Sequence, residues 1–127
     1  EEMKYHELTE KIIGSAYKVY NTMGSGFLES VYEKCLLIEL EKAGLSAESQ
    51  KPIKVFYESQ VVGDFVADLV VGGKVIVELK AVRRVLPVHE VQLVNYLAAT
   101  GIDVGLLINF GEQSVSVKRK TRELRTE

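Results

Sequence analysis

The chain has 127 residues, of which 46% are hydrophobic and 27% charged, and its formal net charge at pH 7 is −2. This length fits one domain with a buried core, and the charge provides no overall basic field of the kind that marks many nucleic-acid binders. No apolar run approaches the roughly 20 residues of a membrane span, so we expect one soluble domain over residues 1–127 with no membrane contact.

The N-terminal residues and the cysteine usage both bear on the compartment. The first residues are acidic and polar, unlike a secretory signal, and the single cysteine, Cys35, cannot form an internal disulfide. Cys35 lies among Val31, Leu36 and Ile38, which favours a buried structural thiol over a nucleophile. We therefore expect a cytoplasmic protein.

Two helices are predicted in the first third of the chain. Over residues 4–22 apolar side chains recur at steps of three and four, and the glycine-rich residues 24–26 end that pattern. A second helix is expected over residues 27–43, with Gly44 as its C-terminal stop. Its apolar stripe is predicted to contain Leu28, Val31, Cys35 and Ile38.

Three strands and a basic loop are expected next. Residues 52–58 alternate in polarity and begin at Pro52, which suits the start of a strand. Two runs rich in valine, near residues 61–71 and 74–80, flank Gly72-Gly73 and predict a β-hairpin. Residues 81–86 follow as a loop.

The last third of the chain predicts a helix and two strands. Pro87 opens the helix at a favoured N-terminal position, and Gly101 closes it. Residues 103–110 form a buried strand and residues 113–118 a more exposed one. Beyond Arg119 we expect little order, so residues 119–127 are predicted to be a poorly ordered basic tail.

These elements define a fold class. The strand–helix–strand unit from residue 74 to residue 110 predicts a right-handed crossover between parallel strands, whereas the earlier strands form an antiparallel meander. The prediction is an α/β (α+β) fold with a mixed central β-sheet flanked by helices.

The hairpin carries charges where a buried strand should be apolar. Such groups are seldom buried unless they are paired or bind a metal. Glu78 and Lys80 share one face of their strand. A two-residue turn would put Asp68 on the opposite face, whereas a three-residue turn over residues 72–74 pairs Asp68 with Glu78. The carboxylates would then need Mg²⁺ or Mn²⁺; an ion pair with Lys80 on an exposed sheet face is the alternative.

Two helices carry further candidate residues. Glu29 borders the buried face near the start of the second helix, where capping of that helix with Gly26 as N-cap is an alternative role. His89, Gln92 and Tyr96 share one stripe of the third helix, a pattern that also fits a solvated face. His89 has no second histidine or cysteine at ligand spacing, which argues against a zinc site.

Several motifs together resemble a known family. Asp68 followed by Glu78-Leu79-Lys80 resembles the D…(D/E)-x-K signature of the PD-(D/E)XK nuclease superfamily. Residues 26–32 fit the G-x-x-E-x-x-Y motif that names the GxxExxY family within it, and residues 92–96 fit the Q-x-x-x-Y element found in several nuclease branches. Residues 105–111 resemble the final core strand. The resemblance covers residues 5–111 and implies a restriction-endonuclease-like α-β-β-β-α-β core.

The resemblance implies a Mg²⁺-dependent nuclease that hydrolyses phosphodiester bonds in DNA or RNA, with Mn²⁺ as the alternative ion. Asp68 and Glu78 would ligate the metal together with the backbone carbonyl of Leu79. Glu29 would complete the acidic site directly or through water. Lys80 would orient or deprotonate the attacking water and stabilise charge on the phosphate.

The same resemblance implies the nucleic-acid contacts. Gln92 would position water or the nucleic-acid backbone, with Tyr96 supporting it, and Arg83 and Arg84 would steer phosphates. Ala67 replaces the proline of the superfamily's name, a position that does not ligate metal. The alternative function is an inactive module of the same fold that binds nucleic acid or a protein partner, and a homodimer or protein partner is expected to help hold the substrate.

Overall fold

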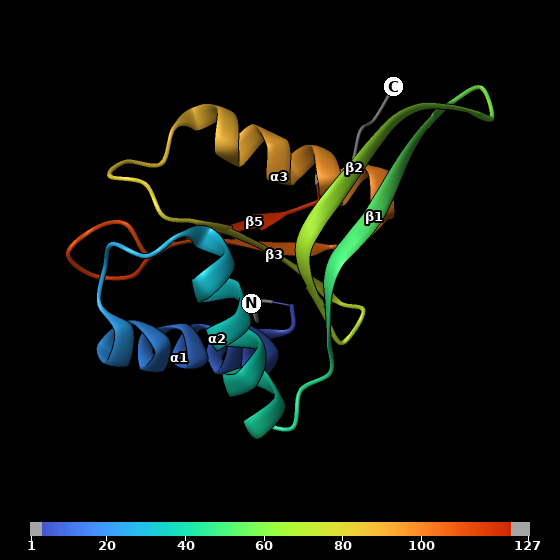
Figure 1. Cartoon of the computed structure of the whole chain (residues 1–127). Coiled ribbons are helices and arrows are strands. Elements are labelled where there is room, and N and C mark those ends of the chain that lie inside the picture. The colour runs from blue at the N-terminus through green and yellow to red at the C-terminus, as the bar shows by residue number, and fades with distance from the viewer. Residues whose placement is uncertain (1–3, 123–127) are drawn as a thin grey trace.

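A computed structural model describes residues 4–122 of the chain (Figure 1). The elements are α1 His6–Met23, α2 Glu29–Lys42, β1 Ala47–Tyr57, β2 Gln60–Val71, β3 Val75–Lys80, α3 Pro87–Thr100, β4 Val104–Asn109 and β5 Ser116–Thr121. The predicted order of elements is confirmed, although β1 begins at Ala47 rather than at residue 52. Pro52 lies inside β1 because β1 is an edge strand, where a missing N–H can face solvent.

The strands form one mixed sheet in the order β1-β2-β3-β4-β5. Neighbouring strands are antiparallel except for β3 and β4, which are parallel and are joined through α3. Helices α1 and α2 cover one face of the sheet and α3 covers the other (Figure 1). The predicted α+β class, with a mixed sheet flanked by helices, is confirmed.

Each face of the sheet has its own apolar core. The larger core packs α1 and α2 on the sheet, and the smaller one packs α3 on the opposite face. The strands contribute alternate residues to the two cores, as a pleated sheet requires, except around Asp68 of β2, where Ala67 and Leu69 lie in different cores. Within residues 4–122, no helix combines the length and apolarity needed to cross a membrane.

The buried face of α2 differs from the predicted stripe. Tyr32, Leu36 and Leu40 are fully buried, whereas Leu28 is 76% exposed and Ile38 is 59% exposed. The predicted stripe is therefore out of phase, because apolar residues occur on several sides of this helix and periodicity alone does not select one. Stacking of Tyr32 on Phe110, with ring centroids 4.5 Å apart, fixes the phase.

Two further expectations for this region are wrong. Cys35 is only partly buried, at the margin of the larger core. Leu28 rather than Gly26 is the N-cap of α2, and Glu29 is the first helical residue, so the predicted cap does not form. Gly26 instead has a φ of 107°, a conformation that turns the chain before the helix begins.

The predicted basic tail begins too early, because β5 continues to Thr121 along the edge of β4. Lys120 forms an ion pair with Glu90 at 2.6 Å, and Arg122 forms one with Asp103 at 2.9 Å. Arg119 donates a hydrogen bond to the Thr9 hydroxyl. These cations therefore hold β5 in place rather than forming a free basic patch, and residues 123–127 lie outside the described part of the chain.

Candidate active site

The turn between β2 and β3 sets the relation between the two acidic residues. The Lys74 N–H donates to the Val71 carbonyl at 3.0 Å, with φ of 60° at Gly72 and 67° at Gly73. Such positive φ values favour glycine, which explains the Gly-Gly pair. The ladder runs from Val71 opposite Val75 to Leu69 opposite Val77, so the same register places residue 68 opposite residue 78. The predicted three-residue turn is confirmed.

Where β2 and β3 separate, hydrogen bonds from backbone N–H groups to side-chain carboxylates replace the backbone hydrogen bonds between the strands. The Asp68 N–H donates to Glu78 Oε2 at 2.8 Å, and the Leu79 N–H donates to Asp68 Oδ2 at 2.8 Å. Each carboxylate thus uses one oxygen to satisfy a backbone amide of the neighbouring strand. The two carboxylates converge in the gap between the strands, as the sequence predicts.

Burial makes the negative charge of this pair costly. Glu78 is only 9% exposed, and burial together with the neighbouring Asp68 charge raises its pKa to about 8. Burial also raises the pKa of Asp68, against the opposing effects of the Leu79 N–H and the Lys80 charge. Among the ion pairs of residues 4–122, none joins Lys80 to either carboxylate. The structural ion pair offered as an alternative is therefore not what the structure contains.

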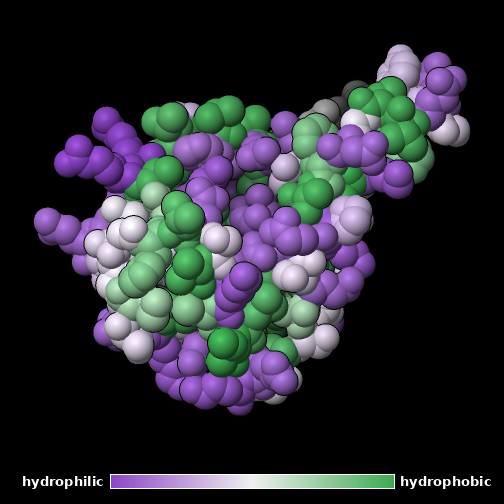
Figure 2. Space-filling model, viewed as in Figure 1, coloured by the Kyte–Doolittle hydropathy of each residue, from purple (hydrophilic) through white to green (hydrophobic). Residues whose placement is uncertain are grey.

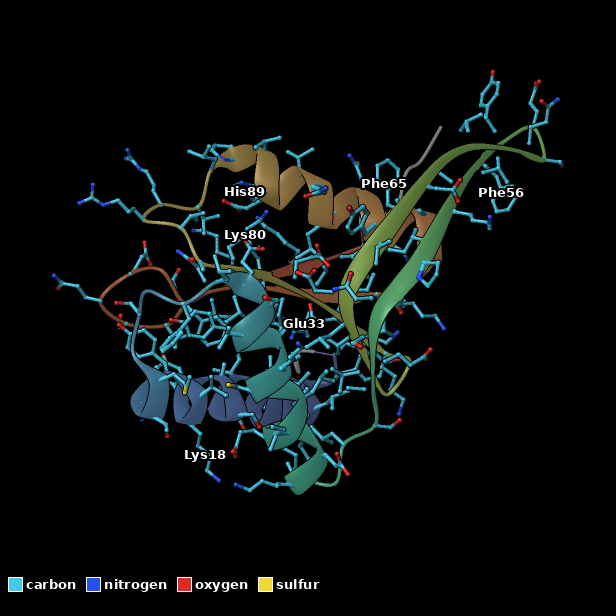
Figure 3. All side chains as sticks on the ribbon, viewed as in Figure 1. Lys18, Glu33, Phe56, Phe65, Lys80 and His89 are labelled. Atoms are coloured by element: carbon cyan, nitrogen blue, oxygen red, sulfur yellow. The ribbon has the colours of Figure 1, made fainter. Side chains whose placement is uncertain are left out.

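A third carboxylate comes from α2, and it is Glu33. Burial and the Asp68 charge raise the pKa of Glu33, and the Glu33 charge in turn contributes to the raised pKa of Glu78. Figure 3 shows Glu33 and Lys80 in the part of the molecule between α2 and α3. Glu29 is exposed one turn earlier, and its charge is not among those that shift the pKa of Asp68 or Glu78. Its place in the site therefore stays a prediction.

Gln50 of β1 connects Glu33 to the strands of the sheet. It lies opposite Asp68, between the pairs Ser49–Leu69 and Lys51–Ala67, and has a φ of 52°. Its side-chain amide donates to Glu33 Oε1 at 2.8 Å and, by hydrogen bonding, lowers the pKa of Asp68.

Neither Glu33 nor Gln50 was predicted from the sequence as a site residue. A signal existed for Glu33, which lies one turn after Glu29 on the same helix, but none existed for Gln50, which precedes the predicted strand.

The third helix presents a bonded pair near the carboxylates. Gln92 Nε2 donates to the Tyr96 hydroxyl at 2.9 Å, and burial with the Glu78 charge raises the pKa of Tyr96. The structure therefore places Tyr96 within reach of the Glu78 charge, with Gln92 bonded to Tyr96. His89 has a structural role at the start of α3, where its Nδ1 accepts the Leu86 N–H at 3.1 Å.

The basic loop after β3 is anchored at its base. Arg83 and Arg84 are exposed, and the backbone of the preceding Val82 is held by the fully buried Asn109. Asn109 Oδ1 accepts the Val82 N–H at 3.0 Å, and Asn109 Nδ2 donates to the Val82 carbonyl at 2.8 Å. Sequence reasoning did not single out Asn109, although a polar residue that ends a buried apolar run is a usable signal.

The donors fit a hard divalent cation, although among residues 4–122 no three acidic, histidine or cysteine side chains are grouped as a metal cluster. Each carboxylate has a second oxygen beyond the one that accepts a backbone N–H. The N–H and C=O groups of one residue in a strand point to the same neighbouring strand. The Leu79 N–H donates to Asp68 of β2, so the Leu79 carbonyl also faces β2, whereas the Lys80 carbonyl faces away from β2 and accepts the Phe110 N–H. Two carboxylates and a carbonyl are oxygen ligands of the type Mg²⁺ and Mn²⁺ prefer.

Comparison with known proteins agrees with this geometry. Residues 6–121 match the PD-(D/E)XK nuclease superfamily, and no curated protein matches the chain. The crystal structure of SSO0001 superposes with a TM-score of 0.59 at 21% identity, over 94% of this chain and 60% of that chain. An alkaline exonuclease, LHK-Exo from Laribacter hongkongensis, superposes with a TM-score of 0.52 at 12% identity, over 91% and 82%. At these identities the two structures show a shared fold, and the chain spans only part of SSO0001.

Proposed function

Because the chain belongs to the PD-(D/E)XK nuclease superfamily, we propose that it hydrolyses phosphodiester bonds of DNA or RNA with Mg²⁺ or Mn²⁺ held by Asp68 and Glu78. One observation supports this most directly. Two carboxylates, the buried Glu78 and the partly buried Asp68, are fixed by backbone amides in a gap of the sheet, where a pKa of about 8 for Glu78 shows that its ionised form lacks a compensating charge. Perturbed acids of this kind, built into a fold of nucleases, favour a catalytic metal site.

Each residue has a role in the proposed reaction. A cation bound by Asp68, Glu78 and the Leu79 carbonyl would lower the pKa of water and offset charge on the phosphate. The Lys80 ammonium would orient the attacking water and stabilise charge on the phosphate, and the proton of the water passes to solvent as the new bond to phosphorus forms. The departing ester oxygen takes a proton from solvent as its bond to phosphorus breaks. Gln92 would orient the water or the phosphate backbone.

Phosphate binding is assigned to the basic loop. Arg83 and Arg84 are exposed guanidinium groups, which match phosphate oxygens in both charge and geometry. Asn109 fixes the base of that loop through the Val82 backbone, so the two cations project from a positioned segment. Binding through them would weaken as the salt concentration rises.

We further propose that the chain belongs to the GxxExxY branch. Tyr32 of the motif donates to the Gly24 carbonyl at 2.6 Å and accepts the Phe27 N–H at 3.3 Å, so it shapes the turn that leads into α2. The motif acid Glu29 lies at the start of that helix and would contribute through water. Glu33, whose charge is coupled to Asp68, would contribute the nearer carboxylate.

A cleavage assay tests the proposal. Single- and double-stranded DNA and RNA would be incubated with the protein over a titration of Mg²⁺ or Mn²⁺, with the variants Asp68→Ala and Lys80→Ala. Both variants should lose activity, whereas Glu41→Gln, which alters an exposed carboxylate near the end of α2, should keep it. Activity that persists in both variants would overturn the assignment. Binding without divalent ions or cleavage, unchanged in Glu78→Gln, would instead identify a non-catalytic binding module.

A further inference from the structure

The distal part of the β1–β2 hairpin, residues 54–66, projects from the body of the protein (Figure 1). We call this segment the arm. Its apolar side chains are conspicuous on the projecting part of the surface in Figure 2, and Phe56 is 59% exposed and Phe65 43% exposed. Neither side chain contributes to the two cores of the domain. Large exposed aromatic side chains of this kind mark a binding surface.

A groove of about 890 Å³ lies between the arm and α3. Its walls combine valine and alanine side chains of β1 and α3 with aromatic rings and hydrogen-bonding groups, which are Phe56, Phe65, Tyr96, His89, Gln92 and Asn95. Figure 3 shows Phe56 and Phe65 on the arm and His89 at the far end of α3. Rings beside neutral donors and acceptors match the faces and edges of nucleobases.

The groove approaches the carboxylate site at Tyr96. Tyr96 and Gln92 line the groove, and the charge of Glu78 raises the pKa of Tyr96. The ring of Phe65 lies against that of Tyr96 at a centroid distance of 5.6 Å and an angle of 44°. A ligand that lies on Tyr96 and Gln92 would therefore approach the proposed reaction centre.

The distribution of charge indicates how such a ligand is oriented. The cation that lies within the arm is already paired, because Lys54 contacts Asp64 at 3.4 Å. Lys80, Arg83 and Arg84, which form none of the ion pairs found within residues 4–122, lie on the other side of the carboxylates, at the end of β3 and in the loop after it. Aromatic rings at the groove and cations at the loop after β3 match a nucleic-acid strand whose bases enter the groove and whose phosphates contact that loop.

We propose that this groove binds unpaired bases of a single-stranded segment of the nucleic-acid substrate. The inference rests on the proposed function, since it names the substrate class of the same site. Bases inside a duplex are stacked on each other and cannot lie on Phe56 or Phe65, so the substrate is single-stranded or frayed where it is bound. The strand then crosses the carboxylates toward Arg83 and Arg84.

Binding in the presence of chelator tests the inference apart from catalysis. The full chain would be titrated into a fluorescent single-stranded oligonucleotide and the matching blunt duplex, and a second oligonucleotide would carry 2-aminopurine to report stacking. The single strand should bind at least tenfold more tightly, with quenching of the 2-aminopurine.

Leucine variants separate stacking from apolar packing, because they keep the apolar volume and remove the ring. Phe56→Leu and Phe65→Leu should each weaken single-strand binding roughly tenfold and reduce the quenching. Tyr17→Leu alters an aromatic residue on α1 with a similar exposure, 44%, and should leave binding unchanged. Equal affinity for the duplex, or unchanged binding in both phenylalanine variants, would overturn the inference.

Two outcomes distinguish the groove from the nuclease activity. Stacking without cleavage in Mg²⁺ would refute the proposed function while supporting the base-binding groove. Cleavage that is unaffected by either leucine variant would support the function and refute the groove. Sedimentation equilibrium tests the competing occupant: a dimer that Phe56→Leu dissociates, with single-strand binding intact, would assign the groove to a second copy of the chain and also refute the inference.

Discussion

Asp68 and Glu78 take over the hydrogen bonding between β2 and β3 at the point where those strands separate. Each carboxylate accepts one backbone N–H at 2.8 Å, from Leu79 and Asp68 respectively. Both acids are therefore held in place by the sheet itself before any cation binds. This fixed geometry costs electrostatic energy, because two negative groups share a largely buried site.

The first prediction concerns stability without metal. The pKa of Glu78 is raised to about 8 in the folded protein, whereas it is near 4.5 when the chain is unfolded. The folded state therefore retains a proton that the unfolded state releases between these pH values, so the free energy of unfolding should fall as pH rises from about 5 to 8. The shift corresponds to at most about 5 kcal/mol.

Thermal denaturation in chelator at several pH values measures this effect. Glu78→Gln keeps the shape of the side chain but cannot ionise, so its stability should vary much less over the same range. A wild-type protein that becomes more stable toward pH 8 in chelator would contradict the prediction.

The second prediction is that metal binding releases a proton. A cation needs ionised Glu78, so Mn²⁺ affinity should rise up to about tenfold per pH unit below pH 8 and then level off. Titration calorimetry at pH 6.5 in buffers of different ionisation enthalpy should give close to one proton released per ion. Asp64→Asn should behave as wild type, since Asp64 is exposed on the same strand as Asp68. A pH-independent affinity would show that Glu78 is not a ligand.

The carboxylate pair could be predicted because its determinants are local. Two glycines and a three-residue turn set the register between Asp68 and Glu78 within a single hairpin. The phase of α2 could not be predicted in the same way, because the burial of Tyr32 depends on stacking with Phe110, far along the chain. Gln50 gave no signal for a similar reason, since its partners Glu33 and Asp68 come from two other elements.

The third prediction distinguishes Glu33 from Glu29, the two acids in the N-terminal half of α2. Glu33 is coupled to Asp68 and Glu78, whereas Glu29 is exposed one turn away. Glu33→Gln should weaken Mn²⁺ binding and lower the cleavage rate about tenfold or more, a loss typical of groups that support ligands. Glu29→Gln should have the smaller effect on both measurements. The reverse order would show that the motif acid reaches the metal in preference to Glu33.

The fourth prediction concerns the strained Gln50. A non-glycine residue at a φ of 52° costs on the order of 1 kcal/mol, yet its amide bonds Glu33 and lowers the pKa of Asp68. Gln50→Gly should change stability by no more than about 1 kcal/mol. Activity should fall, and the acidic limb of the pH–rate profile should move to higher pH because Asp68 loses a hydrogen bond that favours its ionised form.

Ser59→Gly provides the matched control, because Ser59 also has a positive φ, 67°, but lies at the hairpin tip. It should leave both the rate and the pH profile unchanged. A Gln50→Gly protein with wild-type rate and pH profile would show that the strain at this position has no role in the site.

The last prediction links a buried amide to substrate binding. Asn109 accepts the N–H groups of Val82 and Gly111 and donates to the Val82 carbonyl, so it holds the loop that carries Arg83 and Arg84. Asn109→Ala leaves three partly buried backbone groups without this partner and should destabilise the fold by roughly 2–4 kcal/mol. Because the loop loosens while the carboxylates stay on the sheet, KM for nucleic acid should rise more than kcat falls.

Gln113→Ala, which alters an exposed amide in the loop before β5, is the control and should change neither stability nor KM. A folded Asn109→Ala protein with unchanged KM and reduced kcat would instead place Asn109 in support of the carboxylates rather than of the arginine loop.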